Sequence, residues 1–182
     1  MKKTSIFLIS LLFCLSLGGC AGKPEATDIA ATTLPVFEFT QALCHGTDLT
    51  VGRLISEPVS CLHDYSLNVN QVRQAESADL IISNPPYLTA REMQNLMPET
   101  AREPAMALDG GADGLDFYRV LVRQYYDTVR PGGWLVLEIG YAQAEAVLEL
   151  GKAAGWQAGT CRKDAGGNDR VVFFRKPLEN PV

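Results

Sequence analysis

Apolar residues follow two spacings along this chain, and together they predict alternating strands and helices. Runs at Ile29–Leu34, Leu49–Ile55 and Leu80–Ser83 have the spacing or the continuous apolar character of strands. One helix is predicted to begin at Pro35, because proline suits the first helical turn, and another is predicted over Asn68–Ala75. Strands that alternate with helices indicate a parallel sheet with helices on its faces.

The second half of the chain continues this alternation. Segment 97–114 contains prolines and glycines and is predicted to be irregular. The whole pattern predicts an α/β fold with three layers and a mostly parallel sheet. The predicted elements are a short helix from the capping box at Thr89–Glu92 to about Leu96, a helix Phe117–Val129 capped by Asp116, a strand Trp134–Ile139, a helix Ala142–Ala154 ended by Gly155, and strands Gln157–Arg162 and Arg170–Lys176.

The composition is that of a globular protein. The chain has 182 residues, of which 47% are hydrophobic and 20% are charged, so it can bury a core of ordinary size. The net charge is -5. Nonspecific nucleic-acid binding normally needs a basic face, so we expect no nucleic-acid partner.

The first twenty residues have the features of an export signal. Lys2 and Lys3 precede an apolar run, Ile6–Leu17, that is too short for a lasting membrane span. The ending Leu-Gly-Gly-Cys resembles a lipobox, in which Cys20 is acylated and anchors the protein to a membrane. This predicts a lipoprotein outside the cytoplasm. A plain signal peptide that happens to contain a cysteine is the alternative.

The redox state of two later cysteines depends on the compartment. Outside the cytoplasm Cys44 and Cys61 could form a disulfide, and closing that loop would stabilise the fold by about 3 kcal/mol in the chain-entropy model. In the cytoplasm both would stay reduced. The sequence leaves the two alternatives open.

The stretch Asn84-Pro85-Pro86-Tyr87 directly follows a predicted buried strand and carries the clearest candidate chemistry. An amide nitrogen is a poor nucleophile, because its lone pair is delocalised into the carbonyl. A site can help by accepting both N–H hydrogens, which fixes the nitrogen in place. Two prolines stiffen the loop and preorganise its acceptors. Taken alone, the motif is also consistent with a rigid turn after a strand.

Several motifs in order make residues 78–176 resemble the C-terminal half of the release-factor glutamine methyltransferases. They are SNPPY, EPAMALDGGADGLDFYR, RPGGWLVLEIGY and RKDAGGNDRVV. The resemblance implies a Rossmann-like methyltransferase sheet with an antiparallel last strand, and S-adenosyl-L-methionine (AdoMet) as methyl donor. It also implies a peptide-chain release factor as partner, methylated on the glutamine side-chain amide of its GGQ loop.

The same resemblance assigns roles to residues. Asn84, through its side-chain oxygen, and Pro85, through its carbonyl, would accept the amide hydrogens and are the candidate catalytic residues. Pro86 and Tyr87 would complete the substrate-binding site. The family binds AdoMet through a glycine-rich loop after the first strand and an acid after the second. The corresponding loop here, 32–40, has no glycine, so no cofactor-binding residue is assigned.

Residues 1–82 resemble a second family, the zinc or manganese solute-binding lipoproteins of ABC importers. In that family a histidine after the second strand is the first metal ligand, and His63 in the stretch CLHDY matches it. The resemblance implies zinc or manganese as ligand and an importer permease as partner. Zinc needs three or four ligands, and the family's later ligands have no counterpart in this sequence.

Three functions therefore stay open: a protein-glutamine methyltransferase, a metal-binding lipoprotein, or a fusion that does neither. The motifs favour the methyltransferase. The export signal conflicts with it, because AdoMet and release factors are in the cytoplasm. The predicted division of the chain is a signal peptide at 1–20, an importer-like segment at 21–78, a methyltransferase-like half at 79–176 and a tail at 177–182.

Overall fold

The computed structural model of the protein describes residues 27–55 and 68–178. The predicted lipidation site Cys20, the predicted metal ligand His63 and Cys61 lie outside the described residues. Within the described ranges, no helix combines the length and apolar character that crossing a membrane requires.

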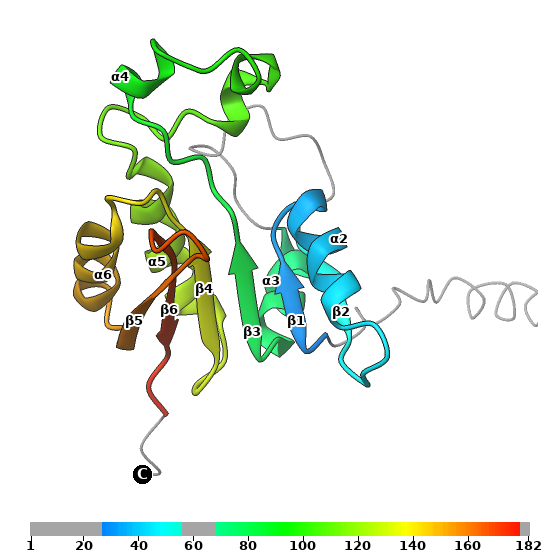
Figure 1. Ribbon diagram of the computed structural model, residues 1–182. Coiled ribbons are helices and arrows are strands. Elements are labelled where there is room, and N and C mark those ends of the chain that lie inside the picture. The colour runs from blue at the N-terminus through cyan, green and yellow to red at the C-terminus, as the bar shows by residue number, and fades with distance from the viewer. Residues whose placement is uncertain (1–26, 56–67, 179–182) are drawn as a thin grey trace, which may run out of the picture.

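A mixed sheet of six strands forms the centre of the molecule (Figure 1). Across the sheet the strands are β2 (Val51–Arg53), β1 (Ile29–Ala31), β3 (Leu80–Ser83), β4 (Trp134–Glu138), β6 (Asp169–Arg175) and β5 (Gln157–Lys163). The strands β2, β1, β3 and β4 are parallel, and β6 pairs antiparallel with both β4 and β5. The predicted α/β class, with a mostly parallel sheet and an antiparallel last strand, is confirmed.

Helices lie on both faces of this sheet. Helix α2 (Leu34–Leu43) contacts β1 and β2, and Figure 1 shows it in front of the sheet, with α3 (Val69–Ser77) and α5 (Asp116–Thr128) behind. Helix α6 (Ala144–Ala153) contacts β5, β6 and α5. The predicted start of α2, and the predicted ends of the other three helices, lie within a few residues of the observed ones.

The prediction that Asp116 caps α5 is wrong. Asp116 is the first helical residue, and the preceding Leu115 occupies the capping position without a side-chain cap. The carboxylate of Asp116 instead accepts a hydrogen bond from Arg119, one turn further along the helix, at 2.9 Å. A charged partner within the helix has thus drawn the side chain away from a capping role.

The core lies between the sheet and the helices behind it. In β4, Leu135 and Leu137 are fully buried, whereas Trp134 on the other face is half-buried, as the period of a strand dictates. Phe117 and Tyr118 of α5 are buried in this core. Trp134 packs at its edge, with its ring 6.0 Å from that of Phe173.

Segment 84–115 forms a lobe above the carboxyl edge of the sheet (Figure 1). It contains the short helix α4 (Ala90–Met93) and two turns of 3-10 helix, η2 (Thr100–Arg102) and η3 (Ala105–Ala107). The predicted capping box between Thr89 and Glu92 is present. The helix ends three residues earlier than the predicted Leu96, so the lobe is largely irregular and depends on loop contacts for its shape.

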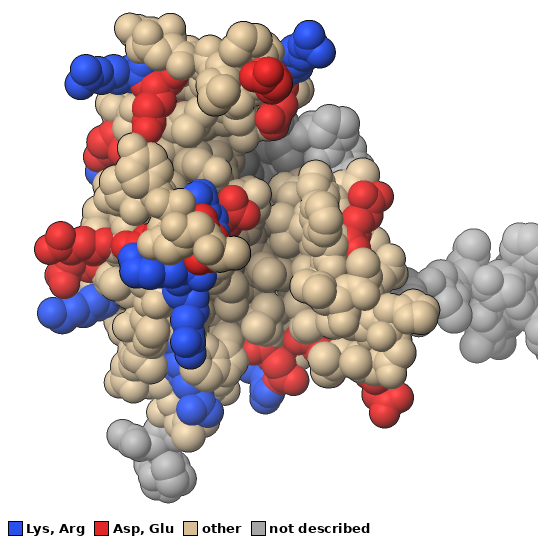
Figure 2. Space-filling view, viewed as in Figure 1, with Lys and Arg blue, Asp and Glu red and all other residues tan. Residues whose placement is uncertain are grey.

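Charged side chains are unevenly spread over the visible face. In Figure 2, Lys and Arg side chains gather mainly over β5 and β6. Two are paired with acids there: Lys163 with Asp169 at 2.6 Å and Arg170 with Asp164 at 3.2 Å. These ion pairs offset part of the local positive charge.

Candidate functional site

Residues 84–87, called the NPPY loop below, leave β3 at the carboxyl edge of the sheet. The strand order reverses beside them, because β1 has β2 on one side and β3 on the other. Open α/β sheets bind their ligands at such a point. Pro85 and Pro86 are buried, Tyr87 is half-buried, and Asn84 is exposed. The loop is therefore anchored by its prolines and presents Asn84 to solvent.

Neighbouring segments fix the end of the NPPY loop. The N–H of Leu88 donates to the carbonyl of Leu108 at 2.9 Å, and the N–H of Gly110 donates to the carbonyl of Leu88 at 2.8 Å. From the opposite side, Nε2 of Gln143 donates to the carbonyl of Tyr87 at 2.9 Å. The main chain after Pro86 is thus held on two sides.

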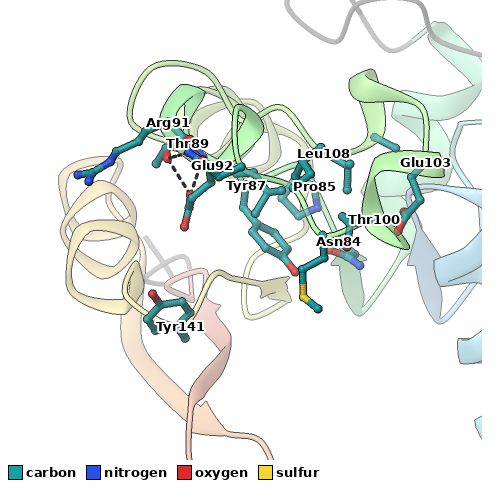
Figure 3. Close-up of a pocket in the computed structure, with 15 residues that line it drawn as sticks. Asn84, Pro85, Tyr87, Thr89, Arg91, Glu92, Thr100, Glu103, Leu108 and Tyr141 are labelled. Carbon is teal, nitrogen blue, oxygen red and sulfur yellow. Dashed lines mark hydrogen bonds between the residues drawn. The ribbon is translucent and has the colours of Figure 1, made fainter.

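A large cavity of about 850 Å³ borders the loop. Figure 3 shows Asn84, Pro85 and Tyr87 along its wall, with Tyr141 facing them from the loop after β4. The volume is in the range of sites that hold small ligands or side chains. The remaining lining comes from the lobe, including Leu88, Thr89, Arg91, Glu92, Asn95, Leu96, Met97, Thr100, Glu103, Ala107 and Leu108.

Two acceptors in this wall have no partner within the described part of the chain. The carboxamide of Asn84 makes no hydrogen bond there, and neither does the carbonyl of Pro85. Pro85 and Pro86 carry no N–H, so the loop offers acceptors without competing donors at these positions. This arrangement can bind a group that carries two N–H hydrogens.

Two phenols at the site stay protonated, that of Tyr87 in the NPPY loop and that of Tyr118 in α5. Burial raises the pKa of Tyr87, the negative charge of Glu138 raises it further, and Arg170 opposes this. Burial likewise raises the pKa of Tyr118 above its ordinary value of 10.0. The hydroxyl of Tyr118 donates to the carbonyl of Glu138 at 2.8 Å. Both side chains are therefore neutral at physiological pH and cannot serve as bases.

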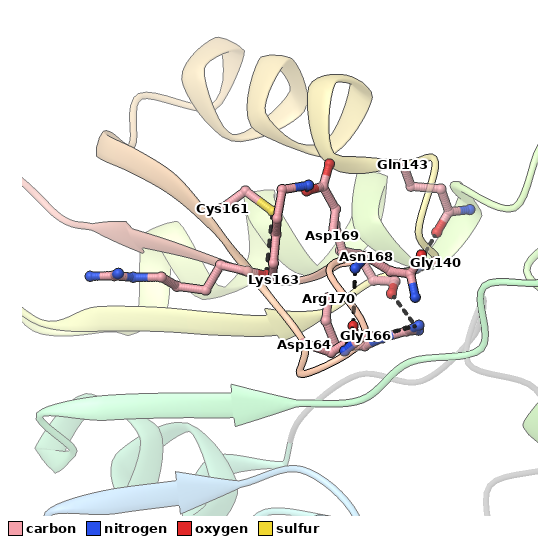
Figure 4. A network of polar contacts seen from close by, with 11 residues as sticks. Gly140, Gln143, Cys161, Lys163, Asp164, Gly166, Asn168, Asp169 and Arg170 are labelled. Carbon is pink, nitrogen blue, oxygen red and sulfur yellow. Dashed lines mark hydrogen bonds and ion pairs between the residues drawn. The ribbon is translucent and has the colours of Figure 1, made fainter.

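Arg170 of β6 makes three hydrogen bonds close to these two tyrosines. Its guanidinium donates to Oδ2 of Asp164 through Nε and Nη2, each at 3.2 Å, and to the carbonyl of Ile139 at 3.2 Å (Figure 4). The sequence assigned no role to Glu138, Gln143 or Arg170. Glu138 and Arg170 stand inside two of the motifs that carried the methyltransferase resemblance, which was the available signal.

The edge between β1, β2 and β3 does not fit AdoMet in its described part. The cavity there is only about 40 Å³, far below the roughly 300 Å³ at which small-molecule sites begin. Thr32 is buried and its hydroxyl donates to Oγ of Ser83 at 3.0 Å. Ile55, also buried, stands after β2, where the resembled family has an acid. The cavity that these described residues line is therefore smaller than a nucleotide cofactor.

The metal alternative gains no support from the described residues. Across 27–55 and 68–178, no three His, Cys, Asp or Glu side chains are grouped so that they could hold a metal ion. The predicted ligand His63 lies outside these ranges. Cys44 is a free thiol.

No family model matches this chain. Curated release factor glutamine methyltransferases match part of it: those of Geobacter sulfurreducens (47% identity over 98 residues, 53% of this chain and 34% of that protein), Caulobacter vibrioides (44% over 110 residues, 59% and 38%) and Cereibacter sphaeroides (50% over 103 residues, 56% and 37%). Relatives with this name thus cover about half of the chain, and the chain spans little more than a third of their length.

Two solved structures are similar to most of the chain at low identity. A release-factor-specific protein-(glutamine-N5) methyltransferase from Alicyclobacillus acidocaldarius has 22% identity and a TM-score of 0.45, covering 85% of this chain and 84% of that one. A methyltransferase from Pyrococcus furiosus has 12% identity and a TM-score of 0.47, covering 93% and 83%. The likeness of residues 1–82 to importer lipoproteins stays a prediction.

Proposed function

We propose that this chain carries the substrate-binding half of an AdoMet-dependent methyltransferase that acts on the side-chain amide of a protein glutamine. One observation carries the proposal: the exposed carboxamide of Asn84, without a partner among the described residues, stands on a loop stiffened by two buried prolines at the rim of a cavity of about 850 Å³. The partial similarity to release factor glutamine methyltransferases supports the same reaction class.

The proposed binding mode uses the two acceptors of the NPPY loop that have no partner among the described residues. Oδ1 of Asn84 and the carbonyl of Pro85 each accept one hydrogen of the glutamine NH2 group. With both hydrogens held, the nitrogen cannot rotate and keeps one orientation, which is the positioning that a poor nucleophile needs. Tyr87, neutral and half-buried, packs beside the side chain. A carboxylate has no hydrogens to donate, so glutamate is excluded.

This chain alone is proposed to bind the amide without transferring a methyl group. The described residues between β1, β2 and β3 leave about 40 Å³ where the methyl donor would have to lie. The proposal therefore assigns acceptor recognition to residues 79–176 and assigns no donor site to the residues before them.

The partner is proposed to be a protein loop that exposes a glutamine, and a peptide-chain release factor is the candidate by resemblance. Its support is that the matched relatives are named for release factors. The predicted membrane anchor at Cys20 and the predicted location outside the cytoplasm stay proposals of the sequence. They conflict with this partner and would restrict its access.

The test is a calorimetric titration of the full chain with a short Gly-Gly-Gln peptide. We expect saturable binding that Asn84→Ala weakens by about tenfold. The variant loses one hydrogen bond between uncharged groups, and with it one of the two contacts that orient the glutamine NH2 group. Asn95→Ala is the matched control, since Asn95 lines the same cavity but its amide donates to the carbonyl of Arg91 at 3.0 Å. Equal losses in the two variants would argue against a specific role for the NPPY loop.

A further inference from the structure

Gln143 joins three loops at the carboxyl edge of the sheet. Its Nε2 donates to the carbonyl of Tyr87 at 2.9 Å and to the carbonyl of Gly114 at 3.1 Å. Its Oε1 accepts from the N–H of Gly140 at 2.9 Å, a contact visible in Figure 4. One side chain thus connects the NPPY loop to the segment before α5 and to the loop after β4.

The surroundings of Gln143 are closely packed. A Cβ atom on Gly114 would lie 2.5 Å from the carbonyl oxygen of Tyr87 and 2.6 Å from Nε2 of Gln143. A Cβ on Gly140 would lie 2.8 Å from Oε1 of Gln143, and one on Gly110 would lie 2.8 Å from Cα of Tyr87. The three loops therefore converge only because these positions carry no side chain, and they leave the Gln143 carboxamide one orientation.

The side-chain contacts of Gln143 do not cap its own helix. Gln143 occupies the residue before α6, yet its side chain makes no capping hydrogen bond to that helix. The three side-chain hydrogen bonds that it makes to described residues all go to loops, and two of them span 29 and 56 residues of sequence. Glu145 in the first turn of α6 is exposed and offers a comparison from the same helix.

We propose that Gln143 is a positioning residue for the amide acceptors of the NPPY loop. By holding the Tyr87 carbonyl, it fixes the main chain that follows Pro85 and keeps the Asn84 and Pro85 oxygens at the separation that an NH2 group requires. Acceptors held in place before the ligand arrives bind it without reorganising. This inference rests on the proposed function, because the acceptors matter only if an amide binds there.

The experiment compares Gln143→Met with Glu145→Gln in the full chain. Methionine has a similar length and volume but makes none of the three hydrogen bonds. We expect the dissociation constant for the Gly-Gly-Gln peptide to rise about tenfold in Gln143→Met, since two donor contacts to the loop region are lost. Hydrogen exchange at the Leu88 and Gly110 amides should accelerate by a similar factor. Glu145→Gln should change neither quantity.

Two outcomes would overturn the proposal that Gln143 positions the acceptors. Faster exchange with unchanged peptide affinity would show that Gln143 supports the loop without positioning the acceptors, and would overturn the proposal. Unchanged exchange and affinity would overturn it as well. If Gln143→Met does not fold, Gln143→Glu keeps the acceptor for Gly140, loses both donors, and carries the same expectation. No peptide binding by the folded unsubstituted chain would instead refute the proposed function, and this inference with it.

Discussion

Replacing Gly114 with alanine tests how tightly the loops around the NPPY loop converge. Gly114 has a φ of +76°, in the left-handed region, so any L residue there is strained by about 1 kcal/mol. A second cost is steric. The new Cβ would lie 2.5 Å from the carbonyl oxygen of Tyr87, which is main chain and cannot move aside as a flexible side chain can. Overpacking of this kind costs about 1–3 kcal/mol.

Gly167→Ala is the matched control for this substitution. Gly167 has a similar φ of +85°, but an added Cβ there meets no atom within 4 Å. It should therefore lose only about 1 kcal/mol of unfolding free energy, from conformational strain. Gly114→Ala should lose about 3 kcal/mol in total, the sum of the two costs.

The assay is urea unfolding of both variants and the unsubstituted chain, followed by circular dichroism. Equal slopes against urea concentration would show that the comparison reports native-state stability. Gly114→Ala should also weaken the Gly-Gly-Gln peptide, because the displaced Tyr87 carbonyl moves the loop that binds it. Equal destabilisation of the two variants, within about 0.5 kcal/mol, would refute the close convergence of the loops.

Two further predictions concern the buried phenol of Tyr118 and the edge of the sheet where AdoMet would bind. Because burial raises the pKa of Tyr118 above 10.0, the neutral phenol contributes stability that is fully present below about pH 10 and is lost as pH rises through the folded-state pKa. Tyr118→Phe should therefore flatten the alkaline decline in unfolding free energy measured by urea titration, and an unchanged decline would contradict the assigned cause. Titrating AdoMet into the full chain should give no saturable heat at micromolar concentrations, because the cavity that buried Thr32 and Ile55 line is only about 40 Å³. Micromolar binding would show that this edge of the sheet accommodates AdoMet.

The sheet could be predicted from the sequence because its strands are marked by local signals. Leu80–Ser83 is an apolar run bounded by Asp79 and Asn84, and the structure gives β3 the same ends. Helix ends were less predictable. Asp116 has the side chain of a helix cap, but Arg119 lies one turn ahead and takes its carboxylate. The preference of aspartate for the capping position does not show whether another side chain will compete for its carboxylate.

The candidate site was predictable where it is contiguous in sequence. The NPPY loop is a run of four residues after a strand, so its placement at the carboxyl edge follows from the strand itself. The contacts of Gln143 with Tyr87 and Gly114, and the close approach of Gly114 to Tyr87, were not predictable, because they join residues 27 to 56 positions apart. A glycine-rich loop in sequence gives no sign of which backbone it must approach.

The most direct test of the central claim is to remove the two amide hydrogens of the ligand one at a time. The full chain would be titrated with three peptides that carry glutamine, N5-methylglutamine or N5,N5-dimethylglutamine at the same position. If the oxygens of Asn84 and Pro85 each accept one hydrogen, affinity should fall at each step, by about two- to tenfold per hydrogen bond. Equal affinity for all three peptides, from a chain shown to be folded, would contradict amide recognition by the NPPY loop.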